Sequence, residues 1–400
     1  MDITERFLKY VSFNTNSDEF SETVPSSPKQ KELGAYLAEE LKGIGLDNAF
    51  MDENGYVYGF LPATSGRENE DNIGFIAHME TSPDVSGDVK GARVIEYCGG
   101  DIELGNGKSI TVSDFPFIEK YKGKHLIVTD GTSLLGADDK AGIAEIVSAL
   151  EYLINHSELS HRGIAVCFTP DEEIGRGTDH FSFDLFNAKA AYTLDGGELG
   201  EIEYENFNAA SVKIDIYGVN IHPGSAKNKM KNAVLIGSEL ISMLPDAETP
   251  AHTEKYEGFY HVSDFEGNES AATVRMIIRD HDMTLFTKRK AFITEIVDFL
   301  NKKYGEGTIA LTLSDSYYNM KEKIKPHFWL VENAEKAMRK LGVEPVSVPI
   351  RGGTDGAMLS YKGLPCPNLC TGGANFHSIH EFVCVESMET ITSLVVELSK

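Results

Sequence analysis

Five acidic or histidine residues, far apart along the chain, each follow a predicted strand or a glycine turn. They are His78, Asp138, Glu173, Asp195 and His377. Two imidazoles and three carboxylates form a mixed nitrogen and oxygen donor set that suits Zn²⁺. One shared carboxylate would let the five residues supply three ligands to each of two ions. Two such ions about 3.5–4 Å apart can activate a bridging water and polarise a carbonyl group.

A second glutamate adjoins one of these donors. Glu172 precedes Glu173 just after the apolar run 163–169. On an extended backbone adjacent side chains point in opposite directions, so Glu173 can bind metal while Glu172 reaches the water. We therefore expect Glu172 to be the general base, which takes the proton of the water and later returns it to the leaving amine.

Each of these residues also has an ordinary interpretation when it is taken alone. Acids before a helix can cap its N-terminus, as Asp138 could. A single histidine such as His78 is often a core or surface residue, and acidic or glycine-rich segments are often turns. The joint occurrence of all five donors is what favours a metal site.

Apolar strands alternate with helices around these residues. The sequence predicts strands at 56–61, 72–77, 125–129, 163–169 and 189–194, and helices at 28–46 and 141–154. This order predicts an open α/β sheet, in which ligands bind beyond the carboxyl ends of the strands. The segment 84–124 is rich in glycine and polar residues, and we expect a long loop with a hairpin there.

A different pattern follows in the middle of the chain. Strands are predicted at 211–218, 259–265, 273–279 and 308–313, and helices at 228–244 and 285–304, which is the β-α-β-β-α-β order of a ferredoxin-like unit. His377 comes after this insertion, so the first domain must be discontinuous. We predict an α/β catalytic domain with an open mixed sheet (1–207 and 317–400) and an inserted ferredoxin-like α+β second domain (208–316).

The composition is strongly acidic, with 37 Lys and Arg against 62 Asp and Glu and a formal net charge of −25. Such a surface argues against nucleic acid or an anionic membrane as a partner. No apolar run approaches the length of a membrane span, and the N-terminal segment lacks the apolar core of a signal peptide. The odd number of cysteines, five, fits a reducing cytoplasm better than a disulfide framework.

Other catalytic motifs are missing or incomplete. GNGKS at 105–109 is not a phosphate-binding loop, because Ile102 stands where the first glycine belongs. No G-x-S-x-G segment is present, and His380-Glu381 is not followed by the second histidine of an H-E-x-x-H helix. Cys366 and Cys370 lack a second close pair and are expected to be small buried apolar residues.

The chain resembles the peptidase T family of bacterial aminotripeptidases, which belongs to the co-catalytic zinc peptidases. The resemblance covers nearly the whole chain and is carried by HMETSPD, LLGADDKAG, FTPDEE, YTLDGG, PIRGGTDG and HSIHEF, among other segments. It implies removal of the N-terminal residue from tripeptides in the cytoplasm, with two Zn²⁺ ions per subunit.

The resemblance also implies a role for each donor. One zinc goes to His78, Asp138 and Asp195, and the other to Asp138, Glu173 and His377. Asp138 then bridges the two ions, Glu172 is the proton acceptor, and the peptide bond between Asp138 and Asp139 is cis. His380 is expected to be a structural neighbour of His377 rather than a ligand.

One position departs from the family, which has Asp where this chain has Glu80. The usual carboxylate accepts the free N–H of the histidine ligand, and glutamate has one more methylene with which to reach it. In the second domain His222 and Asn232 match family positions, and His222 could stabilise the oxyanion once the domains close. Arg279 and Arg351 are candidates to grip a substrate carboxylate.

Two alternatives remain open at this point. One is another di-zinc amidohydrolase, such as a dipeptidase or an aminoacylase. The other is a weakened or non-catalytic peptide-binding homologue, of which Glu80 would be the first sign. Co²⁺ or Mn²⁺ could suit the same ligands, and the oligomeric state, with a homodimer as one arrangement, is also open.

Overall fold

The computed structural model describes residues 1–400, which form two units. Unit 1 comprises Met1–Tyr204, Lys323–Val348 and Thr354–Lys400, and unit 2 comprises Glu205–Glu322 and Pro349–Gly353. The segments 205–207, 317–322 and 349–353 thus group differently from the predicted division. Hydrogen bonds within unit 2 account for this, because Ile350 N donates to the Glu205 carbonyl at 2.9 Å and Asn206 N donates to Asn319 Oδ1 at 3.2 Å.

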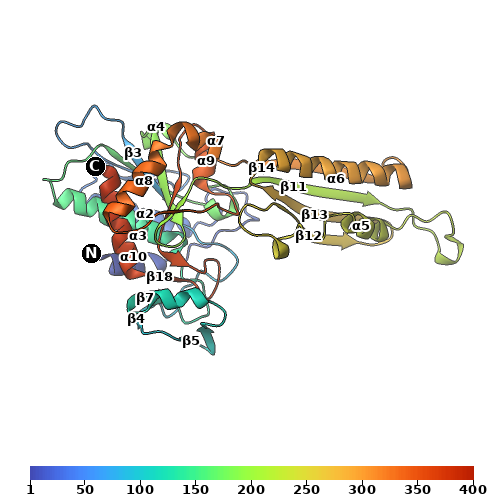
Figure 1. Cartoon of the computed structure of the whole chain (residues 1–400), viewed down its shortest axis with the longest axis horizontal. Helices are drawn as coiled ribbons and strands as arrows, with labels where there is room; N and C mark the ends of the chain where they lie inside the picture. Colours follow the sequence, from blue (N-terminus) through green and yellow to red (C-terminus); the bar gives the residue numbers. More distant parts are fainter. The chain divides into compact units, whose positions relative to one another are not determined.

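A mixed sheet of eight strands forms the centre of unit 1 (Figure 1). In spatial order the strands are β1 (Phe50–Met51), β2 (Val57–Leu61), β8 (Ile164–Thr169), β3 (Ile73–His78), β9 (Ala190–Gly196), β16 (Asn368–Cys370), β10 (Glu201–Glu203) and β15 (Val346–Ser347). The neighbours β8, β3, β9 and β16 are parallel, and nearly all of their residues are buried. Parallel strands that are apolar throughout are typical of a sheet covered on both faces.

Helices surround this sheet. They are α1 (Ile3–Val11), α2 (Gln30–Gly43), α3 (Ala137–Asn155), α4 (Phe183–Phe186), α8 (Trp329–Lys340), α9 (Asp355–Tyr361) and α10 (Val385–Ser399), while the short α7 (Lys321–Ile324) contains the boundary between the units. α3 packs against β3 and β9, and α10 packs against α3 and α8. No helix of the structure has both the length and the apolar character needed to cross a bilayer.

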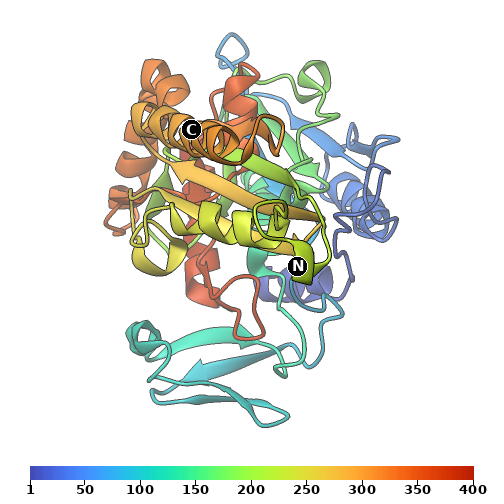
Figure 2. The same ribbon diagram turned by 90° about the vertical axis from the view of Figure 1, so that its right-hand side faces the viewer.

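A smaller antiparallel sheet, separate from the central sheet, completes unit 1; in Figures 1 and 2 its strands from residues 93–128 are cyan to teal and those from residues 373–384 are red. Its strand order is β17 (Gly373–Ala374), β18 (Phe382–Cys384), β7 (Lys124–Val128) and β4 (Arg93–Tyr97). Our prediction that β7 belongs to the central sheet is therefore wrong. The hairpin expected within 84–124 is confirmed as β5 (Ile102–Gly105) and β6 (Lys108–Ile110), but that segment also supplies β4 and a 3₁₀ helix, Pro116–Tyr121.

Unit 2 is an antiparallel sheet of four strands with two helices. The spatial order is β12 (Phe259–Gly267), β13 (Ala271–Asp280), β11 (Asn208–Tyr217) and β14 (Ile309–Tyr317), and the helices are α5 (Ala233–Ser242) and α6 (Met283–Tyr304). Buried and exposed residues alternate along β13, so one face carries the core that α5 and α6 cover. The sequence prediction of an open mixed α/β sheet with a ferredoxin-like α+β insertion is confirmed.

Candidate active site

His78 is the last residue of β3, and its side chain is buried. Its Nδ1 lies 3.0 Å from the carbonyl oxygen of Glu80. A carbonyl oxygen can only accept, so the neutral ring carries its proton on Nδ1 and leaves Nε2 free as a ligand. Nε2 lies 2.9 Å from Asp138 Oδ1 and 3.4 Å from Asp195 Oδ1. Asp195 reaches this point because it is the penultimate residue of β9, the parallel neighbour of β3.

Asp138 lies between two imidazoles. The chain enters α3 through Gly136, which has a positive φ of 81°, and the peptide bond between Asp138 and Asp139 is cis, as expected. Oδ1 of Asp138 faces His78, and Oδ2 lies 3.3 Å from Nε2 of His377. The Asp138 carboxylate therefore offers one oxygen to each histidine. The next carboxylate, that of Asp139, accepts the backbone N–H of His78 at 3.1 Å.

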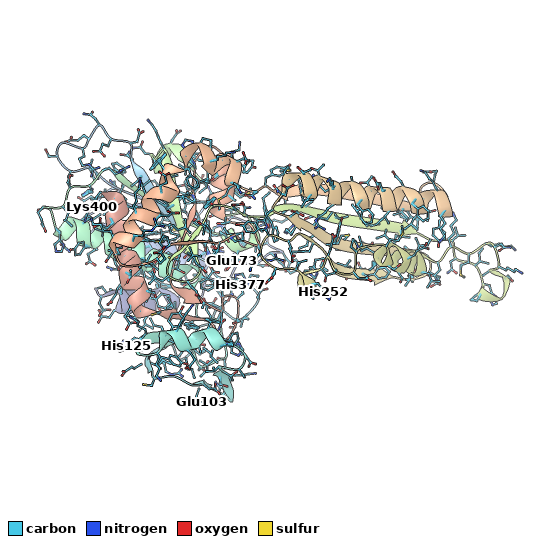
Figure 3. The ribbon with its side chains drawn as sticks, viewed as in Figure 1. Glu103, His125, Glu173, His252, His377 and Lys400 are labelled. Atoms are coloured by element: carbon cyan, nitrogen blue, oxygen red, sulfur yellow. The ribbon has the colours of Figure 1, made fainter.

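Glu172 and Glu173 follow β8 in a tight turn. We expected an extended backbone here, and this is wrong, because Asp171 has a φ of 59° and Glu172–Ile174 form a 3₁₀ helix. The two side chains nevertheless have different partners. Oε2 of Glu173 lies 3.0 Å from Nε2 of His377, and the two residues are labelled side by side in Figure 3. Oε1 of Glu172 accepts the backbone N–H of Asp355, at the start of α9, over 3.2 Å.

Glu80 is fully buried beside His78. Its Oε1 accepts the backbone N–H of Glu173 at 2.8 Å, and its Oε2 lies 3.6 Å from Nδ1 of His78. The main-chain carbonyl of Glu80, and not its carboxylate, is thus the closest acceptor for the His78 ring. The longer side chain therefore connects the turn that carries Glu173 to the end of β3.

The loop between β17 and β18 presents His377, whose φ is 59°. Nε2 of this ring faces Asp138 and Glu173, and Nδ1 lies 2.9 Å from Oδ2 of Asp84. Four residues later Glu381 is buried, and its carboxylate accepts three backbone N–H groups of the segment that leads into α3. The donors are Leu135 at 2.6 Å, Gly136 at 2.9 Å and Asp138 at 3.2 Å. Through these hydrogen bonds, Glu381 connects the His377 loop to the Asp138 segment.

Several of these supporting residues were not foreseen in the sequence analysis. Asp84, Asp171 and Glu381 lie inside the quoted motifs, but only as neighbours of the donors. Asp171 accepts the backbone N–H of Ser26 at 2.6 Å and the side-chain amide of Gln30 at 2.7 Å. These partners are more than 140 positions away along the chain, so no local spacing points to them.

The electrostatics of the cluster are dominated by crowded carboxylates. Burial and neighbouring acids raise the pKa of Glu172 well above its ordinary value and that of Glu173 to about 7. Burial also raises the pKa of Asp195 to about 6. Burial works in the same direction on Asp138, but hydrogen bonds with His377 and His78 outweigh it and lower its pKa. Hydrogen bonds to Asp138 and Glu173 raise the pKa of His377 to about 11.

These donors fit a divalent cation. Ligand atoms of His78, Asp138 and Glu173 lie within 4.8 Å of one another, as do those of His78, Glu172 and Asp195. Oε1 of Glu173 is buried without any hydrogen-bond partner, and a buried carboxylate oxygen normally has one. Carboxylate oxygens and imidazole nitrogens gathered in this way are the donor types of zinc and similar metals.

The remaining predicted residues belong to unit 2. His222 is exposed, and its Nδ1 accepts the backbone N–H of Gly224 at 3.2 Å, which leaves Nε2–H as a donor in the neutral ring. Oδ1 of Asn232 accepts the N–H of Leu235 at 3.2 Å and so caps α5. The capping contact is a structural task that sequence reasoning did not assign to Asn232.

The two arginines of unit 2 have partners of their own. Nη1 of Arg351 donates to the carbonyls of Lys255 at 2.8 Å and Glu257 at 3.1 Å, and its guanidinium lies over the ring of Phe207. Arg279 makes only longer contacts, since its Nη1 lies 3.2 Å from its neighbour's carbonyl, that of Ile278, and its guanidinium lies over Tyr317. Arg279 therefore has more N–H groups available to a ligand than Arg351 has.

Comparison with known proteins agrees with the fold and shows the family of the chain. Residues 111–400 match Peptidase family M20/M25/M40. Peptidase T of Caldanaerobacter subterraneus is 55% identical over 399 residues, which cover 99% of this chain and 97% of that protein. The crystal structure of aminopeptidase PepT from Bacillus cereus has a TM-score of 0.77 at 24% identity, with 99% and 97% of the two chains covered. YXEP of Bacillus subtilis, described as a dinuclear metal-binding peptidase of the M20 family, has a TM-score of 0.64 at 14% identity, with 99% and 97% covered.

The mixed α/β fold, the cluster of acids and histidines and the family match together define a metallopeptidase. The chain belongs to peptidase family M20/M25/M40. It is a peptide hydrolase, and the resemblance to peptidase T noted in the sequence is confirmed. Family membership and the donor cluster together support a divalent-metal site.

Proposed function

We propose that this protein is an aminopeptidase that releases the N-terminal residue of tripeptides, with two Zn²⁺ ions per subunit. The strongest support is the position of Asp138, whose two carboxylate oxygens face two different histidines. His78, Asp138 and Asp195 would hold one ion, and Asp138, Glu173 and His377 the other. The name of the 55% identical relative, Peptidase T, supports the substrate class.

Bound zinc would supply a Lewis acid for the scissile carbonyl and would lower the pKa of the attacking water. Glu172 is the general base in this proposal. Its Oε1 is engaged by the N–H of Asp355, so Oε2 is the atom that takes the proton of the water and returns it to the leaving amine.

Residues around Glu172 and in unit 2 complete the proposal. Glu80 positions both His78 and the turn that carries Glu173. Nε2–H of His222 would donate to the oxyanion that forms from the scissile carbonyl. Arg279, Arg351 and Asn232 would bind the far end of the peptide, where an arginine can hold the terminal carboxylate through two parallel hydrogen bonds.

A peptide panel combined with a metal count tests the proposal. Purified protein would be assayed with a dipeptide, a tripeptide, a tetrapeptide and the N-acetylated tripeptide, while zinc per chain is measured by atomic emission. We expect two zinc ions per chain and cleavage of the tripeptide with a free amine. Preferred cleavage of the dipeptide or of an N-acyl amino acid would establish the dipeptidase or aminoacylase alternative. No cleavage by zinc-loaded protein would establish the non-catalytic one.

A cytoplasmic location also belongs to this proposal. All five cysteines are free, and four of them are buried, which suits a reducing compartment. A homodimer stays a prediction, and the elution volume on a calibrated sizing column tests it.

A further inference from the structure

His377 is the most exposed of the five donors, with 40% of its side chain accessible. Its Nε2 faces Glu173 at 3.0 Å and Asp138 at 3.3 Å. The opposite ring nitrogen, Nδ1, lies 2.9 Å from Oδ2 of Asp84. An ionised carboxylate can only accept, so this contact requires the proton of the neutral ring to be on Nδ1. In the neutral ring, Asp84 thereby leaves Nε2 unprotonated, on the side of the ring where the other donors lie.

The loop that carries Asp84 is held in place. Asn16 spans it, because its Nδ2 donates to the carbonyl of Ser82 at 2.7 Å and its Oδ1 accepts the N–H of Gly87 at 2.6 Å. Oγ of Ser82 donates to the same Oδ2 of Asp84 at 2.9 Å. The carbonyl of Ser86 accepts the N–H of Leu134, just before the Asp138 segment. The carboxylate is therefore presented from an ordered loop, although 63% of its side chain is exposed.

An ordinary surface ion pair is the alternative interpretation. Exposed ion pairs contribute only about 0–1 kcal/mol, mainly because two mobile side chains must be ordered. The Asp84 loop is already ordered by Asn16, and His377 is held by its contacts on the other side of the ring. The contact also differs from that of His78, whose Nδ1 faces a neutral main-chain carbonyl. Only at His377 does a carboxylate lie within hydrogen-bond distance of Nδ1, because the carboxylate nearest to Nδ1 of His78, that of Glu80, is 3.6 Å away.

We propose that Asp84 is a positioning residue, which fixes the tautomer and ring orientation of His377 and strengthens this histidine as a ligand of one of the two metal ions. The inference rests on the proposed di-metal function. Carboxylates behind a ligating histidine commonly raise metal affinity, and their loss costs about 10–100-fold. Because Asp84 contacts His377 and not His78, its loss should weaken the binding of one ion only.

Stepwise Zn²⁺ affinities, measured by competition with a chromophoric chelator, test the inference. In Asp84→Leu we expect one of the two dissociation constants to rise about 10–100-fold, while the other stays within twofold. Asp84→Asn keeps an acceptor oxygen without the charge and should give an intermediate rise. Asp88→Asn removes an equally exposed acid that pairs with Lys90, and it should change neither constant. In Co²⁺-substituted protein, the visible absorption of one ion should shift in Asp84→Leu and not in Asp88→Asn.

The outcomes separate the inference from the proposed function. Suppose that the wild-type protein binds two ions and that Asp84→Leu has the same two dissociation constants as Asp88→Asn. The role of Asp84 is then refuted, and the di-metal site stands. An equal loss of affinity for both ions in Asp84→Leu would also refute the role of Asp84, because that result indicates general damage to the site. If wild-type protein binds fewer than two ions, the di-metal proposal fails, and the assignment of Asp84 fails with it.

Discussion

The backbone N–H of Glu173 donates a hydrogen bond to Oε1 of Glu80 over 2.8 Å. This bond joins the turn after β8 to the end of β3, and both strands deliver a proposed metal ligand. The extra methylene of glutamate is what allows the side chain to cover this span while its other oxygen stays 3.6 Å from His78. These contacts argue against the interpretation of Glu80 as a sign of lost activity.

Replacement of Glu80 by the shorter aspartate should lower activity. Glu80→Asp cannot keep both contacts, so the N–H of Glu173 loses its acceptor, at a cost of about 1 kcal/mol. We expect kcat with a tripeptide to fall about fivefold. Glu80→Gln keeps the acceptor oxygen and the length, and it serves as the matched comparison. A rise in kcat for Glu80→Asp would show instead that the native residue is a compromise.

Removal of the proposed general base should affect the chemical step alone. Glu172→Gln retains an oxygen to accept the N–H of Asp355 but cannot take up the proton of the water. We expect kcat to fall about 10²–10⁴-fold with little change in KM. Zinc per chain and the unfolding temperature are measured in parallel and should match the wild type. A variant with full zinc and near-normal kcat would assign proton transfer to another group.

Recognition of the substrate carboxylate can be tested with amidated peptides. The wild type should cleave a tripeptide with a much lower KM than the same tripeptide amide. In Arg279→Met this preference should shrink at least tenfold, because one charged hydrogen-bonding partner is lost.

Arg351→Met should weaken the same preference and relax the limit on peptide length. It should also lower the unfolding temperature, because Arg351 donates to the carbonyls of Lys255 and Glu257. An unchanged ratio of the two KM values and an unchanged length profile in both variants would remove the arginines from substrate binding.

Metal binding should release protons and weaken in acid. The pKa of His377 is raised to about 11 by its hydrogen bonds to Asp138 and Glu173, so the metal-free protein carries a proton on this ring at pH 7 that a metal ion must displace. Burial raises the pKa of Glu173 to about 7, so part of its population also loses a proton. Titration calorimetry in buffers of different ionisation enthalpy should detect at least one proton released per chain at pH 7. Zn²⁺ affinity should fall as the pH is lowered toward 5, whereas a pH-independent affinity would contradict this assignment of protons.

Glu145, in the middle of α3, should limit stability at alkaline pH. Its side chain is fully buried, neither carboxylate oxygen has a hydrogen-bond partner, and burial raises its pKa well above the ordinary value. The folded protein therefore resists loss of this proton, and its stability falls as the pH rises above the unfolded-state pKa of 4.5. Glu145→Gln should raise the unfolding temperature by about 1–2 °C at pH 8, for roughly 1 kcal/mol gained. The difference should shrink at pH 5, and a constant difference would point to packing instead of charge.

The sequence was sufficient to predict the fold class and to identify five side chains that lie close together in the structure. Both predictions have a physical basis. Apolar runs such as 72–77 and 163–169 indicate buried strands, and the residue after such a strand lies at the edge where ligands bind. Local patterns could not show which sheet the strand before Asp138 joins, because pairing partners lie far along the chain. The supporting contacts of Asp84, Asp171 and Glu381 could not be predicted for the same reason. The 3₁₀ turn at Glu172 follows Asp171, whose φ is positive.

Strand β16 lies between β9 and β10 in the middle of the main sheet, although it comes from residues 368–370 of the 400-residue chain. His377 and Glu381 follow it directly. During synthesis, therefore, neither β9 nor β10 can pair with its neighbour β16 before residues 368–370 have been made. A chain that stops before residue 368 lacks β16, His377 and Glu381, so the proposed metal site cannot form until the segment that follows unit 2 in the sequence has been synthesised.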